Sequence, residues 1–443
     1  MTVIQKRWSV WTLVLLMSIL HAGTASAKPE PLDLQKMIDQ AKPGDAIELA
    51  PGTYAGPVKI NKPLTIQATH NGTVILQNDD GTDPAITVNA DQTTIAGLRI
   101  SDEIGKESAT VLVTGNQATL KDMQIVTGSD GIAVRDANEG VISGIKIDWA
   151  ADGVRMADKG NGIDLFNAHG WQISNNTIRD MHDGIYMEYS DNAVVSRNTI
   201  ERSRYGVHCM YTVGTVIKEN EGKMNVTGAM VMTATKVMVV GNTFSKQSEN
   251  VNSQGILLYD AHLITVQDNT VDGNRVGLYV EQSSNNKLMN NRVSYNFIGI
   301  QLLEANDNPI ESNQFVGNVA DAQARGSENN ELTANYWDGF QGIDTDGDGK
   351  SNIKYEINPF FQGLTKKRPA FQLFFHSPGM NFLEELYQTD KALWTKDVSP
   401  LMAPPDSSLH GEGKNDGILT GLTGLGLLGC SALIIFRMRR RSE

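Results

Sequence analysis

A glycine followed by alternating apolar side chains recurs at nearly constant spacing through the middle of the chain. These glycines are Gly184, Gly206, Gly228, Gly255, Gly277 and Gly299, and the steps between them are 22, 22, 27, 22 and 22 residues. Asparagines keep the same spacing at Asn176, Asn198, Asn220, Asn242, Asn269, Asn291 and Asn313. A fixed period of this length indicates a solenoid, in which each repeat forms one coil that stacks on the next.

Short alternating segments separated by Gly, Asn, Asp and Pro turns continue on both sides of these repeats. Without helices between the strands, the period predicts an all-β fold: a right-handed parallel β-helix of the pectin-lyase type over residues 28–330. Residues 32–41 have helical apolar spacing and predict an N-terminal cap helix over the open edge of the first coil. We assign Gly131 and Gly153 to the glycine register, and we expect the five extra residues before Gly255 to form a loop at 246–254. The asparagines should stack as a ladder at one turn.

The two ends of the chain carry targeting patterns. Lys6 and Arg7 precede an apolar run that ends at Ala25-Ser26-Ala27, so residues 1–27 predict a cleaved secretory signal, with an uncleaved anchor as the alternative. Residues 417–436 form an uncharged apolar run, followed by a basic tail at 437–443. This pattern predicts a single transmembrane helix with a cytoplasmic tail, with a buried helix of a soluble domain as the alternative.

The remaining C-terminal residues divide into a non-repeating acidic and docking segment, 331–398, and a linker, 399–416, rich in Pro, Ser, Gly and Asp. After removal of the signal, we expect a protein that is folded in the periplasm and tethered to the inner membrane. The formal net charge is −13, and removal of Lys6 and Arg7 with the signal changes it to −13 − 2 = −15. This charge argues against nucleic acid as a partner. The two cysteines, Cys209 and Cys430, lie in different contexts, so no internal disulfide is expected.

Strand alternation sorts the side chains that follow each glycine. The first and third positions are apolar in every repeat and are expected to face the core: Ile185, Met187, Val207, Cys209, Ala229, Val231, Ile256, Leu258, Leu278, Val280, Ile300 and Leu302. The second and fourth positions must then face outward. In two adjacent repeats they hold His208, Met210, Met230 and Met232.

These four side chains are the candidate copper ligands. Adjacent coils are about 4.8 Å apart, so the four would form one outward patch. Thioether and imidazole donors favour copper, Cu(I) in particular, whereas zinc sites favour Cys, His and carboxylate. His182 and Met238 are secondary candidates, and Cys209 is expected to be a core residue. The alternative is an apolar docking face for a partner, which Tyr186, Leu257, Tyr259 and Tyr279 would extend.

Two sets of acidic residues have competing interpretations. Asp344, Asp346 and Asp348 match positions 1, 3 and 5 of a calcium-binding loop, but position 12 is Tyr355 rather than Glu. A bound Ca²⁺ and a metal-free Asp/Gly turn both fit this pattern. Asp130, Asp152 and Asp183 each precede a glycine, where acids could serve a lyase or epimerase. Their shared register favours turn formation instead, and no carboxylate, base and cation cluster in one register.

Five motifs carry a resemblance to a known family: residues 204–211, 228–232, 335–338, 344–349 and 374–378. With them the chain resembles NosD, the periplasmic β-helix protein of nitrous oxide reductase maturation, from about residue 45 to residue 386. The resemblance implies a non-enzymatic protein on the outer face of an ABC transporter, which has a membrane subunit and an ATPase. It also implies copper delivery from a chaperone lipoprotein and assembly of the copper–sulfide centre of the reductase.

Two features depart from the family pattern, namely Cys209 in place of an expected aromatic residue and the apolar C-terminal run. From the resemblance and the outward patch of histidine and methionine, we expect a copper-binding accessory protein rather than an enzyme. A carbohydrate-active β-helix enzyme, either a polysaccharide lyase or an epimerase, is one alternative. A purely structural docking scaffold is the other.

Overall fold

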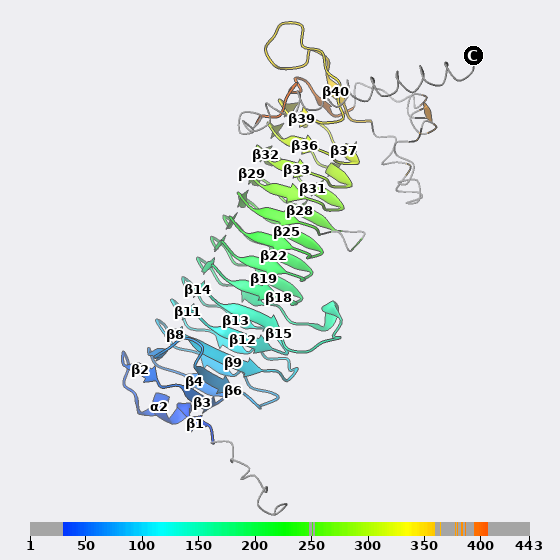
Figure 1. The fold of residues 1–443 in the computed structure, drawn as a ribbon. Coiled ribbons are helices and arrows are strands. Elements are labelled where there is room, and N and C mark those ends of the chain that lie inside the picture. Colours follow the sequence, from blue (N-terminus) through cyan, green and yellow to red (C-terminus); the bar gives the residue numbers. More distant parts are fainter. Residues whose placement is uncertain are drawn as a thin grey trace, which may run out of the picture.

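The computed structural model describes residues 30–247, 250, 253–358 and 394–405, together with the single residues 364, 377, 379, 382, 383 and 386. Successive strands pass in turn through three sheets of 14, 12 and 15 strands, in which neighbouring coils pair in parallel. Figure 1 shows the resulting elongated stack, with the first coils in blue at one end and a yellow loop extending beyond the other. The predicted parallel β-helix is confirmed.

The N-terminal end is closed by α2 (Leu34–Gln40), which follows the short strand β1 (Leu32–Asp33). The Asp33 side chain accepts a hydrogen bond from the backbone N–H of Lys36 and so caps the helix. Leu34 and Ile38, one turn apart, are buried in the core of the first coils. The predicted cap helix is therefore present, two residues shorter at its start and one at its end.

The 12-stranded sheet carries the candidate site. In chain order its strands are β4 (Val58–Ile60), β7 (Ile86–Val88), β10 (Val111–Val113), β13 (Ile132–Arg135), β16 (Ile163–Phe166), β19 (Asp183–Glu188), β22 (Tyr205–Met210), β25 (Thr227–Met232), β28 (Gln254–Tyr259), β31 (Val276–Glu281), β34 (Ile298–Leu303) and β37 (Ala320–Arg325). The strands pair without a slip, so equivalent positions form straight columns across the coils. All twelve side chains predicted to face the core are buried.

Close packing between coils explains the glycine column. A Cβ built on Gly206 would lie 2.4 Å from the carbonyl oxygen of Gly228, and one on Gly184 would lie 2.7 Å from that of Gly206. Since the clash is with backbone of the next coil, no side-chain movement relieves it. The repeating glycine is thus required by the distance between coils.

The asparagine ladder is confirmed and extends beyond the predicted rungs. At each rung the backbone N–H and the Nδ2 of one asparagine donate to Oδ1 of the next, as from Asn198 to Asn220, both at 2.9 Å. The ladder reaches Asn335 and ends on Asp397 in β41 (Lys396–Asp397). The Oδ2 of Asp397 accepts from Asn335 N at 3.1 Å, Asn335 Nδ2 at 2.9 Å and Trp337 Nε1 at 3.0 Å.

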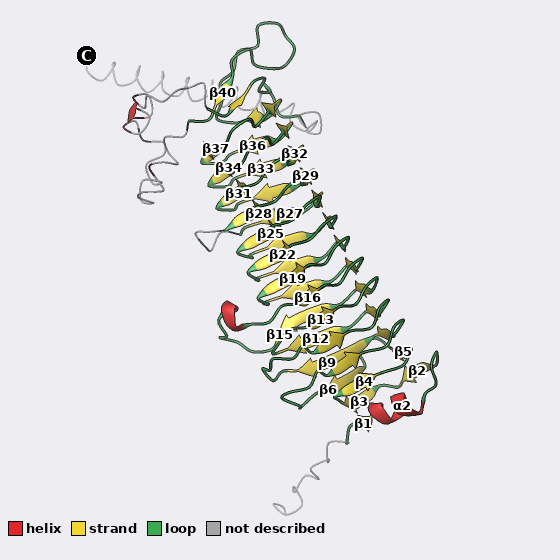
Figure 2. Cartoon of the chain, turned by 180° about the vertical axis from the view of Figure 1, so that it is seen from behind, coloured by secondary structure: helices red, strands yellow, loops and turns green. Residues whose placement is uncertain are grey.

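The assignment of Gly153 to the glycine register is wrong. The glycine that pairs in register after Gly131 is Gly162, because this coil is 162 − 131 = 31 residues long. The additional residues leave the stack between β15 (Lys146–Trp149) and β16 and contain the 3-10 turn η1 (Met156–Asp158). This excursion projects from the side of the stack in Figure 2. The loop expected at 246–254 lies between β27 (Thr243–Ser245) and β28, except that Gln254 already belongs to β28; residues 248, 249, 251 and 252 lie outside the described residues.

Among the residues that the structure describes, no helix is long and apolar enough to cross a membrane. The predicted signal, most of the linker, the predicted membrane span at 417–436, the basic tail and Cys430 lie outside these residues.

Candidate metal centre

The structure brings the four principal candidates together on the outer side of the 12-stranded sheet. His208 on β22 is the register partner of Met230 on β25, and Met210 is the partner of Met232. One column therefore runs Tyr186, His208, Met230, Leu257 and Tyr279, and a second runs Glu188, Met210, Met232 and Tyr259.

The predicted outward direction of these side chains is confirmed, but the centre of the patch is buried. His208 is 5% exposed, Met230 9% and Leu257 8%, whereas Met210, Met232 and Tyr259 are half-buried. The Tyr186 ring lies 4.9 Å from the His208 ring, and the Tyr205 ring lies 4.8 Å from it. These two rings flank the imidazole and help to cover it, so the imidazole lies outside the solenoid core yet shielded from solvent.

Asp183 and Arg204 complete the surroundings of His208. The Asp183 side chain is 1% exposed, and its Oδ2 lies 2.9 Å from Nδ1 of His208. Arg204 donates to the same carboxylate through Nε at 2.8 Å and Nη2 at 2.7 Å. Burial acts to raise the pKa of Asp183, but the hydrogen bonds and charges of Arg204 and His208 outweigh it, so the pKa is lowered.

The second imidazole nitrogen has no such partner. Nε2 of His208 is buried and makes no hydrogen bond to any described residue. A buried polar nitrogen without a hydrogen-bond partner destabilises the fold unless a ligand binds to it. The neighbouring column position is a thioether, Met230. An unpaired imidazole nitrogen beside a methionine fits a soft metal such as copper.

The two secondary candidates have different places. His182 immediately precedes Asp183 and is half-buried; its pKa is lowered, mainly by burial and also by the charges of Arg204 and His208, against that of Asp183. Met238 lies on β26 (Met238–Val240) of the 15-stranded sheet and is exposed. The structure therefore keeps His182 near the site and does not bring Met238 to it.

Cys209 is buried between Met187 and Val231 on the inward side, as predicted. Burial raises the pKa of its thiol to about 12. The thiol is therefore protonated at neutral pH. Because the thiolate is the form that binds metals, Cys209 acts as a core residue and not as a ligand.

The residues proposed as a docking face are only partly available. Tyr186 Oη donates to Glu188 Oε2 at 2.9 Å, and Leu257 is buried, while Tyr259 and Tyr279 are half-buried. A more exposed aromatic group lies beside the methionines and was missed in the sequence. Tyr189 and Tyr211 stack at 4.9 Å, and Phe166 meets Tyr189 edge-on at 5.9 Å. The 22-residue spacing of the two tyrosines was the available signal.

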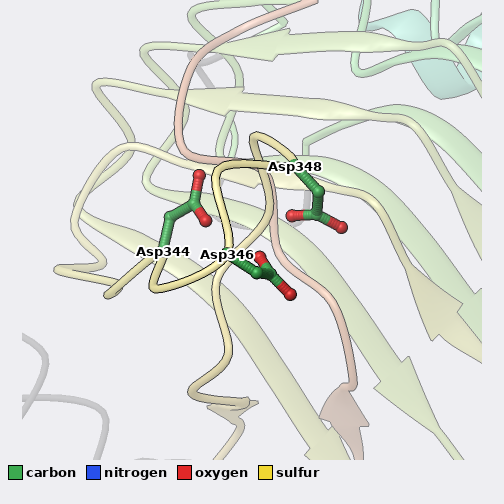
Figure 3. Close-up of side chains that lie close together, drawn as sticks. All are labelled: Asp344, Asp346 and Asp348. Carbon is green, nitrogen blue, oxygen red and sulfur yellow. The ribbon is translucent and has the colours of Figure 1, made fainter.

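The three aspartates of the acidic loop gather in the segment that follows the last coil, where Figure 3 shows their side chains on one loop. One carboxylate oxygen from each of Asp344, Asp346 and Asp348 lies within 4.8 Å of the others. The loop is also held without metal, because Asp344 accepts from the N–H groups of Gly347 at 2.7 Å and Gly349 at 3.0 Å. Glu356 contacts Lys396 at 3.4 Å, and Tyr355 stacks on Trp337 at 4.4 Å.

Turn formation accounts for Asp152, which lies in a turn before Gly153, but not for Asp183. Asp183 lies within β19 and contacts Arg204 and His208 one coil away, which corrects its assignment as a turn residue. A carboxylate, a cation and a base therefore do meet, but from different register positions, because the register partner of Asp183 is Tyr205. Asp130 accepts a bond from the Asn161 N–H at 2.7 Å, while Asp152 is exposed in the excursion after β15.

Comparison with known proteins gives one family match. Residues 148–342 match the NosD family model, described as a periplasmic copper-binding protein. This range holds every candidate copper ligand but not the three aspartates of the acidic loop, and the predicted resemblance to NosD is confirmed. The family is periplasmic. No curated protein sequence matches the chain.

Solved structures share the fold. A mannuronic acid-specific family 6 polysaccharide lyase from human gut microbiota has a TM-score of 0.51 at 14% identity, covering 68% of this chain and 83% of that one. The periplasmic alginate epimerase AlgG has a TM-score of 0.50 at 14% identity, covering 68% and 80%. A family 28 exopolygalacturonase from Yersinia enterocolitica has 0.50 at 12% identity, covering 69% and 75%. At such identities the similarity concerns the β-helix and not its chemistry.

Proposed function

We propose, from the NosD match of residues 148–342, that this chain is a periplasmic copper-binding accessory protein in the assembly of the copper–sulfide centre of nitrous oxide reductase. The observation that carries the proposal is the unpaired Nε2 of the buried His208, one coil from Met230. His208 and Met230 would hold the metal, with Met210 and Met232 in the neighbouring column. Thioether donors favour Cu(I) over Cu(II).

A binding experiment tests the site. Cu(I) is titrated anaerobically into the full-length chain against a coloured chelator, for the wild type and for His208→Asn and Met230→Leu. The asparagine amide can still donate to Asp183, and leucine keeps most of the methionine volume, so both variants should fold. We expect each to weaken Cu(I) binding at least about tenfold, which corresponds to about 1.4 kcal/mol.

Met238→Leu is the matched control, because it removes a thioether from a different sheet. Its affinity should equal that of the wild type. If His208→Asn and Met230→Leu also bind as the wild type does, the site is elsewhere.

The partners and the attachment belong to the same proposal. The protein would act on the outer face of an ABC transporter, receive copper from a chaperone lipoprotein and serve nitrous oxide reductase. The half-buried methionines and the exposed Tyr189 and Tyr211 lie together and offer a contact surface for such proteins. Residues 417–436 would tether the protein to the inner membrane, and their deletion should release it into the periplasmic fraction.

The carbohydrate alternative has a specific observation on its side, because Asp183, Arg204 and His208 combine a carboxylate, a cation and a base. Their arrangement argues against acid–base catalysis on a polymer. The guanidinium of Arg204 is already paired with the Asp183 carboxylate, and both His208 and Asp183 are shielded from solvent. We therefore propose that the chain is not an enzyme. Formation of unsaturated uronate products from alginate or pectate by the purified protein would reverse this choice.

The acidic loop is proposed to bind Ca²⁺ in a structural role. Asp344, Asp346 and Asp348 supply oxygen ligands of the type that Ca²⁺ prefers. Glu356, the nearest acid to position 12, is held by Lys396, so the site lacks a bidentate acid and should be weak.

A further inference from the structure

We infer that Asp183 is a positioning residue: held by Arg204, it keeps His208 protonated on Nδ1 and thereby leaves Nε2 as the only imidazole nitrogen able to bind a metal. The metal-binding part of this inference rests on the proposed copper function. The protonation pattern is a property of the metal-free protein and can be measured on its own.

The contacts of Asp183 allow only one role toward His208. Arg204 donates two hydrogen bonds, one to each carboxylate oxygen, and the N–H of Tyr205 donates to Oδ1 at 3.3 Å. Arginine remains charged at any physiological pH, so the bidentate partner favours an ionised carboxylate. An ionised carboxylate has no proton to donate and accepts only. At 2.9 Å from its Oδ2, the Nδ1 of His208 must therefore be the donor.

A neutral imidazole has a single N–H, so a proton on Nδ1 leaves Nε2 with a free lone pair. The structure agrees with this assignment, because Nε2 has no acceptor among the described residues to which it could donate. The neighbouring rings restrict the imidazole as well, with Tyr186 and Tyr205 each centred within 5 Å of it. Arg204 lies over the Tyr205 ring at 4.4 Å, so one guanidinium fixes both the carboxylate and a ring beside the imidazole.

This arrangement is the one by which carboxylates orient histidine ligands of metals. Loss of such an outer partner typically lowers metal affinity 10–100-fold. Asp183 would touch no metal itself, so its effect must pass through His208. A purely structural role, in which the ion pair only joins two coils, predicts that any equivalent pair matters equally.

The chain provides a second bidentate pair, whose carboxylate is more exposed: the Asp180 side chain is 39% exposed and that of Asp183 is 1% exposed. Arg202 binds Asp180 through Nε at 2.8 Å and Nη2 at 2.7 Å, and it joins the same two coils without contacting a histidine. Asp180→Asn thus controls for the loss of a bidentate pair between these two coils, at a more exposed position. Asp183→Glu keeps the carboxylate and serves as the conservative variant.

The test reads the imidazole directly. Full-length, metal-free protein labelled with ¹⁵N-histidine is studied by long-range ¹⁵N–¹H correlation, which distinguishes the two tautomers, and the His208 signal is identified by its loss in His208→Asn. We expect the Nδ1–H form in the wild type and in Asp180→Asn, and its replacement by the Nε2–H form or by a mixture in Asp183→Asn. An Nε2–H tautomer in the wild type, or an unchanged tautomer in Asp183→Asn, would overturn the inference.

Cu(I) titration supplies the second readout. Asp183→Asn should weaken binding 10–100-fold, Asp183→Glu should recover part of the loss, and Asp180→Asn should bind as the wild type does. Equal losses in Asp180→Asn and Asp183→Asn would show that the pair only joins coils. If the tautomer follows Asp183 but His208→Asn binds copper normally, the proposed copper site fails while the positioning of the imidazole stands.

Discussion

Removal of the Asp397 carboxylate should loosen the C-terminal coil. One oxygen of this residue accepts hydrogen bonds from the backbone and side chain of Asn335 and from the Trp337 indole, and all three residues are fully buried or nearly so. A hydrogen bond to a charged group contributes about 1.5–3 kcal/mol, and a buried donor left unpaired costs about 1–3 kcal/mol. Since the three donors share one acceptor and their losses do not add fully, we expect Asp397→Ala to destabilise the last coil by about 3–5 kcal/mol.

Asp397→Asn separates geometry from charge. Its Oδ1 can accept the Asn335 donors as at every other rung, but its Nδ2 then faces the N–H of Ser399, which donates to Oδ1 of Asp397 at 3.1 Å. We expect a smaller loss of about 1–2 kcal/mol. Asp338→Ala is the control, because that exposed carboxylate on the last coil accepts a bond from the N–H of Gly317.

Hydrogen exchange at the Asn335 amide is the informative assay. Each coil of a solenoid contacts only its neighbours, so the loss should appear as local opening of the end rather than as global unfolding. The Asn335 N–H should exchange much faster in Asp397→Ala, while amides near Asn198 keep their protection. Unchanged exchange at Asn335 would refute the role given to Asp397.

Three further outcomes follow from the structure. Because burial raises the pKa of the Cys209 thiol to about 12, this thiol in a Cys430→Ser background should resist a thiol reagent at pH 8 while folded and react on unfolding. The pKa of Asp183 lies below its ordinary 3.8, so its contribution to stability is present in full above about pH 4 and is lost as the pH falls through the lowered folded value. The difference in unfolding free energy between the wild type and Asp183→Asn should thus be constant near neutrality and shrink below about pH 4; a difference unchanged at pH 2–3 would contradict this. Millimolar Ca²⁺ should raise the melting temperature of the wild type and not of the variant Asp344→Asn, Asp346→Asn, Asp348→Asn; equal shifts in both would exclude the acidic loop as the site.

The period of the repeat was sufficient to predict the fold and the side of the sheet on which each residue lies. It was insufficient for exposure, because alternation gives the direction of His208 but not the rings of Tyr186 and Tyr205 that flank it. Met238, in contrast, could have been excluded from the sequence. It lies ten residues after Gly228, rather than two or four, and so belongs to a different strand of the coil from the candidate ligands.

Asp183 was misjudged for a different reason. Aspartate before glycine is ordinary turn chemistry, and this local pattern concealed a contact with the next coil. Residue 183 plus one period of 22 is Tyr205, which lies between Arg204 and His208. Comparison of equivalent positions in adjacent coils would therefore have predicted this cluster. The partner of Asn335 was not accessible, because Asp397 lies 62 residues away in a segment with no repeat.

The excursion between β15 and β16 has a consequence for how such a protein can change. The coil between Gly131 and Gly162 has nine residues more than the coil that follows it, yet β13 and β16 still pair position for position. Residues inserted between two strands of a coil therefore do not change the alignment of the columns. Surface loops that recognise one partner or another can lengthen, shorten or be exchanged while the histidine and methionine columns keep their alignment. In this architecture the chemistry of a site and the identity of its partners can evolve as separate traits.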